Sequence, residues 1–103
     1  MSNDFHPGQR WISESEPELG LGSILRVTDR RITAVFAASG ERREYARANA
    51  PLRRVRFRPG DKIRNRENVS LSIESVIERN GLFFYSGGTR ELCETDLSDA
   101  ISF

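Results

Sequence analysis

Residues that could perform catalysis are scarce in this sequence of 103 residues. Its one histidine, His6, stands beside Pro7 near the start of the chain, and its one cysteine is Cys93. A hydrolase or transferase needs a nucleophile with a neighbouring base, or a cage of metal ligands. We therefore expect no catalytic residue, no metal site and no cofactor. We interpret His6 as a solvated side chain and Cys93 as a small, half-buried strand residue.

Two motifs that bind ligands in other proteins are weak here. Glu14, Glu16 and Glu18 surround Pro17 and could hold a cation, but this pattern is typical of a solvated acidic loop. The glycine pair in 20–22 lacks the helix and the Gly-Lys-Ser/Thr ending of a nucleotide-binding loop. The sequence predicts neither nucleoside triphosphate hydrolysis nor a small-molecule substrate.

Arginine is the residue type that could carry recognition, because its planar guanidinium pairs with phosphate and carboxylate groups. Every basic residue except Lys62 is an arginine. Alternate residues of a strand share one face, so Arg54, Arg56 and Arg58 are predicted to project together. Val55 would then face the core. The candidate residues for binding a partner or nucleic acid are Arg30, Arg31, Arg42, Arg43, Arg47, Arg54, Arg56 and Arg58.

The charges are distributed unevenly along the chain. Residues 1–58 hold 11 Lys or Arg and 7 Asp or Glu, a net charge of +4, whereas residues 59–103 hold 5 and 8, a net charge of −3. The whole chain carries only +1. Because non-specific affinity for nucleic acid depends on the number of phosphates neutralised, this favours an acidic protein partner. The basic first half and the acidic second half could alternatively attract each other.

Aromatic residues offer a second means of recognition, since an aromatic cage can hold a methylated cation. Phe36, Phe57 and Phe103 fall where strand alternation points inward, and we expect them in the core. Trp11 corresponds to Ile63 in the second half of the chain. A small barrel can hardly bury an indole completely. Trp11 is therefore expected either to pack between two units or under the acidic loop, or to contact a partner, and it joins the candidate residues.

The elements that position these residues are written twice in the sequence. Pro7–Ile12 returns as Pro59–Arg64, and Val55–Phe57 returns as Ile101–Phe103. The offset between the copies falls from 59 − 7 = 52 to 101 − 55 = 46 residues. Chance matches would scatter, whereas a duplicated unit with shorter loops in its second copy gives a steady drift.

Each copy is predicted to contain five short strands, because Val, Ile, Thr and aromatic residues alternate there between turn signals. Asn80-Gly81 is a strong two-residue hairpin signal, since both positions require positive φ. The predicted strands are Arg10–Ile12, Ser23–Thr28, Ile32–Phe36, Glu41–Ala46 and Arg53–Phe57, followed by Lys62–Arg64, Ser70–Glu78, Leu82–Ser86, Glu91–Glu94 and Ile101–Phe103. The expected fold class is all-β, with two tandem five-stranded SH3-like barrels as domains 1–58 and 59–103.

Several motifs together resemble the N-terminal region of a known family. They are Gly8-Gln9-Arg10-Trp11-Ile12-Ser13, Glu18-Leu19-Gly20-Leu21-Gly22, Tyr45-Ala46-Arg47 and Pro59-Gly60-Asp61. This combination resembles the RapA (HepA) family, bacterial RNA-polymerase-associated ATPases of the Swi/Snf type. The resemblance spans nearly the whole chain and implies that the barrels are tudor-like or KOW-like. The ATPase lobes of the family lie downstream, and nothing here matches them.

The resemblance implies a non-catalytic regulatory module of a DNA-translocating ATPase. It would dock on RNA polymerase and restrain the ATPase lobes of the parent chain during polymerase recycling. The alternative is a nucleic-acid-binding module that guides RNA or DNA at the polymerase, and a third possibility is a structural spacer. The expected location is the bacterial cytoplasm, associated with the nucleoid. No apolar run approaches the ~18 residues that a membrane span needs, so no membrane partner is expected.

Overall fold

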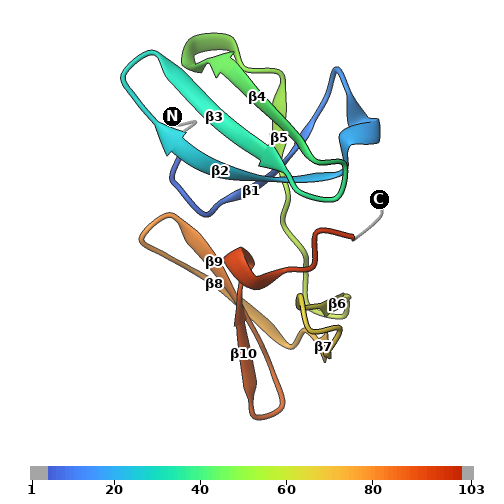
Figure 1. Cartoon of the computed structure of the whole chain (residues 1–103). Helices are drawn as coiled ribbons and strands as arrows, with labels where there is room; N and C mark the ends of the chain where they lie inside the picture. Colours follow the sequence, from blue (N-terminus) through green and yellow to red (C-terminus); the bar gives the residue numbers. More distant parts are fainter. Residues whose placement is uncertain (1–4, 101–103) are drawn as a thin grey trace.

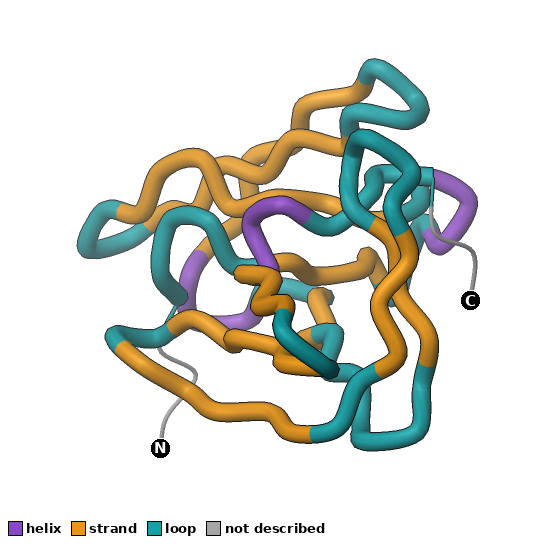
Figure 2. Tube along the Cα trace, turned by 90° about the horizontal axis from the view of Figure 1, so that it is seen from below, coloured by secondary structure: helices purple, strands orange, loops and turns teal. Residues whose placement is uncertain are grey.

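The computed structural model describes residues 5–100, which form two small β units stacked one on the other (Figure 1). The first unit contains β1 (Arg10–Ser13), β2 (Leu21–Val27), β3 (Arg31–Phe36), β4 (Glu41–Ala46) and β5 (Leu52–Arg54). The second contains β6 (Lys62–Arg64), β7 (Ser70–Ser72), β8 (Ser75–Arg79), β9 (Leu82–Gly87) and β10 (Arg90–Cys93). The described helical turns, purple in Figure 2, are the 3-10 segments η1 (Pro17–Leu19), η2 (Arg47–Asn49) and η3 (Glu94–Asp96).

The first unit has the strand order of an SH3-like barrel. Its five strands pair antiparallel in the order β4-β3-β2-β1-β5, so the last strand returns beside the first. Trp11 of β1 lies opposite Gly22 of β2 on one side and Arg54 of β5 on the other. A Cβ at Gly22 would lie 2.6 Å from the ring of Phe36, so glycine lets that ring pack directly on the backbone. The four predicted strands from Arg10–Ile12 to Glu41–Ala46 are confirmed, whereas the predicted strand Arg53–Phe57 was too long, because β5 ends at Arg54.

A β-bulge interrupts the pairing of β2 with β3. Ile24 pairs with Ala34, but the next pair joins Arg26 to Thr33, which leaves Leu25 as the extra residue. A bulge redirects side chains. Here Ile24 is buried whereas both Leu25 and Arg26 face solvent. The sequence-based assignment treated this segment as a regular strand.

The second unit corrects the predicted strand over Ser70–Glu78. This segment divides into β7 and β8, separated by buried Ile73 and by Glu74. β7 pairs with β6, while β8 joins a three-stranded sheet of order β10-β9-β8. The unit thus presents two small sheets, and the predicted last strand Ile101–Phe103 lies outside the described residues.

The turn between β8 and β9 has the predicted conformation. Asn80 and Gly81 have φ values of 55° and 82°, and Arg79 pairs with Leu82 across the two-residue loop. Positive φ at both central positions is the requirement of a type I′ hairpin. The Asn-Gly prediction is confirmed.

The hydrophobic cores show that the two units are not independent. One cluster lies within the first unit and contains Trp11, Ile32 and Phe36 among its members. The other lies in the second unit, but Ile12, Leu21 and Val55 of the first half belong to it. Ile12 and Leu21 pair across β1 and β2 on the side opposite to Trp11 and Gly22. One side of the β1–β2 pair therefore fills the first core, and its reverse side packs on the second unit.

Candidate functional site: the junction of the units and the arginine surface

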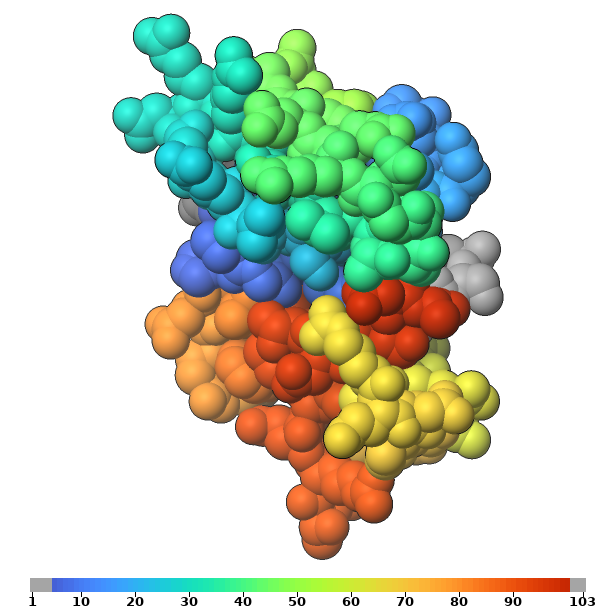
Figure 3. All heavy atoms as spheres, viewed as in Figure 1, coloured from blue at the N-terminus to red at the C-terminus, as the bar shows by residue number. Residues whose placement is uncertain are grey.

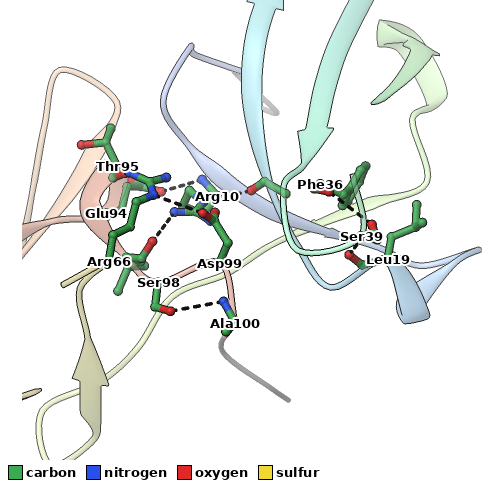
Figure 4. A network of polar contacts seen from close by, with 12 residues as sticks. Arg10, Leu19, Phe36, Ser39, Arg66, Glu94, Thr95, Ser98, Asp99 and Ala100 are labelled. Atoms are coloured by element: carbon green, nitrogen blue, oxygen red, sulfur yellow. Dashed lines mark hydrogen bonds and ion pairs between the residues drawn. The ribbon is translucent and has the colours of Figure 1, made fainter. Parts of the chain in front are cut away.

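Arg10 of β1 is fully buried where the two units meet. Its backbone N–H donates to Oε1 of Glu94 at 2.9 Å. Its guanidinium donates to the carbonyl oxygens of Gly22 at 3.1 Å and Leu97 at 2.8 Å, and it pairs with the carboxylate of Asp99. Arg10, Glu94 and Asp99 converge in Figure 4. An arginine of the first unit is thus held by oxygen atoms of the second.

Glu94 is the acidic counterpart and is also fully buried. Its Oε2 accepts a hydrogen bond from the backbone N–H of Phe83 and another from Nη2 of Arg54, both at 2.5 Å. Together with the bond from Arg10, both oxygens have partners in the two units. A buried carboxylate is tolerated only when it is paired and hydrogen-bonded. We call this contact the junction; it contains Arg10, Arg54, Phe83, Glu94, Leu97 and Asp99.

Burial and pairing shift the ionisation of the junction in opposite directions. Burial lowers the pKa of Arg10, and the nearby Asp99 carboxylate raises it in part. An arginine nevertheless remains charged in a protein. Burial acts to raise the pKa of Asp99. The hydrogen bond from Arg66 at 3.1 Å and the charge of Arg10 act to lower this pKa, and together with the other arginine contributions they outweigh burial. The net pKa of Asp99 lies below its ordinary value, so its pairing is strongest as a carboxylate.

Arg54 belongs to the junction and not to an open surface. Its guanidinium donates to Glu94 and lies 4.2 Å from the ring centroid of Phe83. Arg56 is exposed and lies 5.3 Å from the same ring, so the guanidinium groups of Arg54 and Arg56 lie near one ring although β5 ends at Arg54. Arg58 is exposed and, with Arg56, lines a depression of about 340 Å³. Only Arg56 and Arg58 of this trio are open to a partner.

Trp11 lies in the core of the first unit. Its side chain is only 8% exposed, and its ring packs on Phe5 with 4.5 Å between the centroids. Its indole N–H donates to Oε1 of Gln9 at 3.0 Å. Leu19, which ends the acidic loop, lies in the same cluster. Trp11 is therefore packed inside the protein and does not form a contact surface, because almost none of its ring is exposed to a partner.

Arg43 and Arg47 support loops of the first unit. Arg43 pairs with Glu16 at 3.2 Å and Glu41 at 2.7 Å. The hydrogen bonds with Glu16 and Glu41 raise the pKa of Arg43, and the bond with Glu16 has the larger effect. Arg47 donates from Nη1 to the carbonyl oxygen of Thr28 at 3.1 Å. Both guanidinium groups already have partners and are less available for another molecule.

Arg30, Arg31 and Arg42 remain on the surface. Arg31 lies 3.5 Å from the carboxylate of Glu44, and both side chains are mostly exposed. Such a surface pair contributes little to stability and can exchange partners easily. Within residues 5–100, Arg30, Arg42 and also Arg26 have no ion pair and no side-chain hydrogen bond. The sequence analysis missed Arg26, because its exposure depends on the bulge at Leu25.

A surface depression among the described residues of the first unit is lined mainly by arginine, glutamate and tyrosine side chains. It has a volume of about 440 Å³, lies on edge strand β4 and has as its lining Arg30, Arg31, Glu44, Tyr45 and Ala46. Among the described residues, no three His, Cys, Asp or Glu side chains are grouped as a metal site. His6 is exposed and Cys93 is half-buried, as predicted. The part of the chain between residues 5 and 100 also contains no helix with the length and apolarity of a membrane span.

Comparison with known proteins assigns both units. Residues 5–55 match the family described as RapA N-terminal Tudor like domain 1. Residues 57–103 match the RapA N-terminal Tudor like domain.

Curated relatives extend the match over the whole chain. It is 46% identical to the RNA polymerase-associated protein RapA of Pseudomonas savastanoi pv. phaseolicola and to that of Pseudomonas putida (strain GB-1). It is 45% identical to RapA of Pseudomonas fluorescens (strain Pf0-1). Each alignment covers 100% of this chain but 11% of the relative. With both units matched and this identity over its full length, the chain belongs to the RapA family, of which it represents the N-terminal Tudor-like region.

Proposed function

We propose that this chain is the non-catalytic docking and regulatory region of a larger RNA-polymerase-associated ATPase. The observation that carries the proposal is its identity of 46%, over its whole length, to proteins named for their association with RNA polymerase. The chain spans only 11% of those relatives, so their other activities would reside elsewhere. The expected setting is the bacterial cytoplasm, at the nucleoid where polymerase works.

The junction supports a docking role. Arg10 and Glu94 connect the two units through buried hydrogen bonds, and Ile12 and Leu21 add apolar contact. A partner would therefore meet a preorganised surface, and preorganisation reduces the entropy lost on binding. The same rigidity would let the region hold the ATPase lobes of the parent chain in a restrained arrangement.

Direct nucleic-acid binding is the second candidate function. It is favoured by the unpaired guanidinium groups of Arg26, Arg30 and Arg42. The acidic residues among them weaken it, because Asp29 and Glu44 would repel phosphate groups. The net charge of +1 also predicts weak non-specific affinity.

Two titrations separate these functions. In the first, the labelled 103-residue chain is titrated with bacterial RNA polymerase core enzyme. In the second, it is titrated with single- and double-stranded oligonucleotides at about 50 and about 200 mM salt. Saturable binding to polymerase, with no oligonucleotide binding below about a millimolar, is expected. Micromolar oligonucleotide binding with a steep salt dependence would instead favour the nucleic-acid function.

The regulatory part of the proposal needs the parent protein. ATP hydrolysis is compared between the full-length protein and a variant that lacks residues 1–103. If this region restrains the ATPase lobes, its removal raises the hydrolysis rate without polymerase. An unchanged rate would contradict the restraint while leaving the docking function intact.

A further inference from the structure

We propose that the solvent side of β2, β3 and β4 binds an acidic protein surface that presents an apolar side chain. We call this side the docking face; it contains Leu25, Arg26, Arg31, Val35, Arg42 and Glu44. The inference rests on the proposed function, since it specifies where the region docks and what chemistry the polymerase surface would offer.

The docking face is the uncovered part of a sheet side that already makes an interface. Arg10 and Ile12 of β1 lie on this side, opposite to the first core, and the second unit covers them. Ser23, the partner of Arg10 in β2, pairs next with Val35 in β3. The same sheet side thus continues across β3 and β4, where nothing in residues 5–100 buries Arg42. In Figure 3 the β3–β4 hairpin, teal and green, lies on the visible surface above the second unit.

The bulge in β2 supplies the centre of the docking face. Leu25 is 54% exposed, although its neighbour Ile24 is buried. An exposed leucine alone carries little meaning. Here, however, the bulge turns both Leu25 and Arg26 to the solvent side, with Leu25 between the Ile24–Ala34 pair and the Arg26–Thr33 pair. Half-buried Val35 lies on the same side of the neighbouring strand. The result is a small apolar centre with an arginine attached.

Arginines surround this centre at the spacing of the sheet. Arg26 shares a row with Thr33 and Glu44, and Arg42 shares the next row with Val35. Neighbouring strands lie ~4.8 Å apart and residues rise ~3.3 Å along a strand, which places the backbones of Arg26 and Arg42 on the order of 12 Å apart. Two unpaired guanidinium groups at this separation can form ion pairs with carboxylates on either side of an apolar contact.

Charge and composition favour protein over nucleic acid as the occupant. Glu44 stands within the arginine row, 3.5 Å from Arg31, and a continuous phosphate backbone would meet this negative charge. A protein partner can place a basic or neutral group there. Arginine is enriched in protein interfaces, which combine an apolar centre with a polar rim. The arrangement of Leu25 and Val35 inside Arg26 and Arg42 has this composition.

Ile77, another large apolar residue exposed on a strand of the described chain, gives weaker support for a docking surface. Ile77 is 45% exposed on the outer side of β8, opposite Phe84 of β9. Arg79 already covers the ring of Phe84 at 4.7 Å. That surface has no set of unpaired arginines around it, and nothing in its charge specifies a partner.

The test measures binding of RNA polymerase core enzyme to the 103-residue chain carrying Arg26→Glu with Arg42→Glu, or Leu25→Ser alone. Arg90→Glu is the matched control, because Arg90 is exposed on the second unit. The double variant is expected to bind about tenfold or more weakly, Leu25→Ser severalfold more weakly, and the control within about twofold of wild type. All four substitutions are at exposed positions, and circular dichroism checks that each variant remains folded.

The outcomes distinguish the two proposals. If the unsubstituted chain does not bind polymerase, the proposed function fails. If it binds and both docking-face variants bind equally well, only the docking face is wrong. An equal loss for Arg90→Glu would reveal a general charge effect and overturn the inference. Loss of wild-type binding after nuclease treatment would show that nucleic acid bridges the two proteins, which also overturns it.

Discussion

The guanidinium of Arg10 in β1 pairs with the carboxylate of Asp99, 89 residues further along the chain. The same carboxylate accepts a hydrogen bond from Nε of Arg66 at 3.1 Å. One acidic residue therefore pairs with an arginine from each unit. Because an unpaired buried charge is costly, the reverse side of the first sheet depends on the second unit for its stability.

Replacing the buried arginine tests this dependence. Arg10→Met keeps the length of the side chain but removes the donors to Gly22, Leu97 and Asp99. We expect the free energy of unfolding to fall by about 3 kcal/mol, because buried acceptors lose their partners. Urea unfolding measures the change. Arg90→Met on the surface should change stability by less than about 0.5 kcal/mol. Equal effects of the two substitutions would contradict the role given to Arg10.

The lowered pKa of Asp99 predicts a specific acid sensitivity. A carboxyl group whose pKa is lower in the folded state stabilises that state above its unfolded pKa, here near 3.8, and loses this contribution as the pH falls through the folded value. Asp99→Asn should therefore destabilise the protein near neutral pH, and its effect should diminish as the pH falls below about 4.

Unfolding free energies of the wild type and Asp99→Asn are compared at about pH 6 and about pH 3. The difference between them should shrink at the lower pH. Glu91→Gln, an exposed substitution on β10, serves as the control. A difference that stays constant with pH would show that Asp99 acts through its shape and not through its charge.

The close contact of β7 with β9 depends on a glycine. A Cβ at Gly87 would lie 2.0 Å from the carbonyl oxygen of Ser72, a backbone atom that cannot rotate away. Gly87→Ala should separate β7 from β9 and destabilise the protein by about 1–3 kcal/mol. Ser86→Ala on the same strand is the matched control. Thermal unfolding measures both variants, and a Gly87→Ala protein as stable as wild type would refute this account of the packing.

Local patterns in the sequence predicted most of the fold. The strands of the first unit and the Asn80-Gly81 turn follow from alternation and from the φ requirement of the hairpin, both of which involve near neighbours. The division of the predicted strand Ser70–Glu78 was missed, because it depends on the distant backbone contact between Ser72 and Gly87. Burial of such a segment cannot be inferred from alternation alone.

The candidate site was less predictable than the fold. Arginine density identified Arg30, Arg31 and Arg42 as exposed, but Arg54 proved to be bound to Glu94. Arg10 was treated only as the start of a strand. Its partners in the second unit lie 84 and more residues away, and no local pattern distinguishes an arginine paired at such a distance from a solvated one.

The shared junction finally predicts that the chain unfolds as one cooperative unit. Trp11 is the one tryptophan and lies in the first core, so its fluorescence reports on the first unit. Backbone amides of β9 report on the second through hydrogen exchange followed by NMR. Since Ile12 and Leu21 lie in the second core and Arg10 is bound by Glu94, loss of either unit would expose apolar surface and buried charge of the other. Both probes should therefore give the same unfolding free energy across a urea titration. A first unit that unfolds at a distinctly different urea concentration from β9 would show that the junction does not couple them.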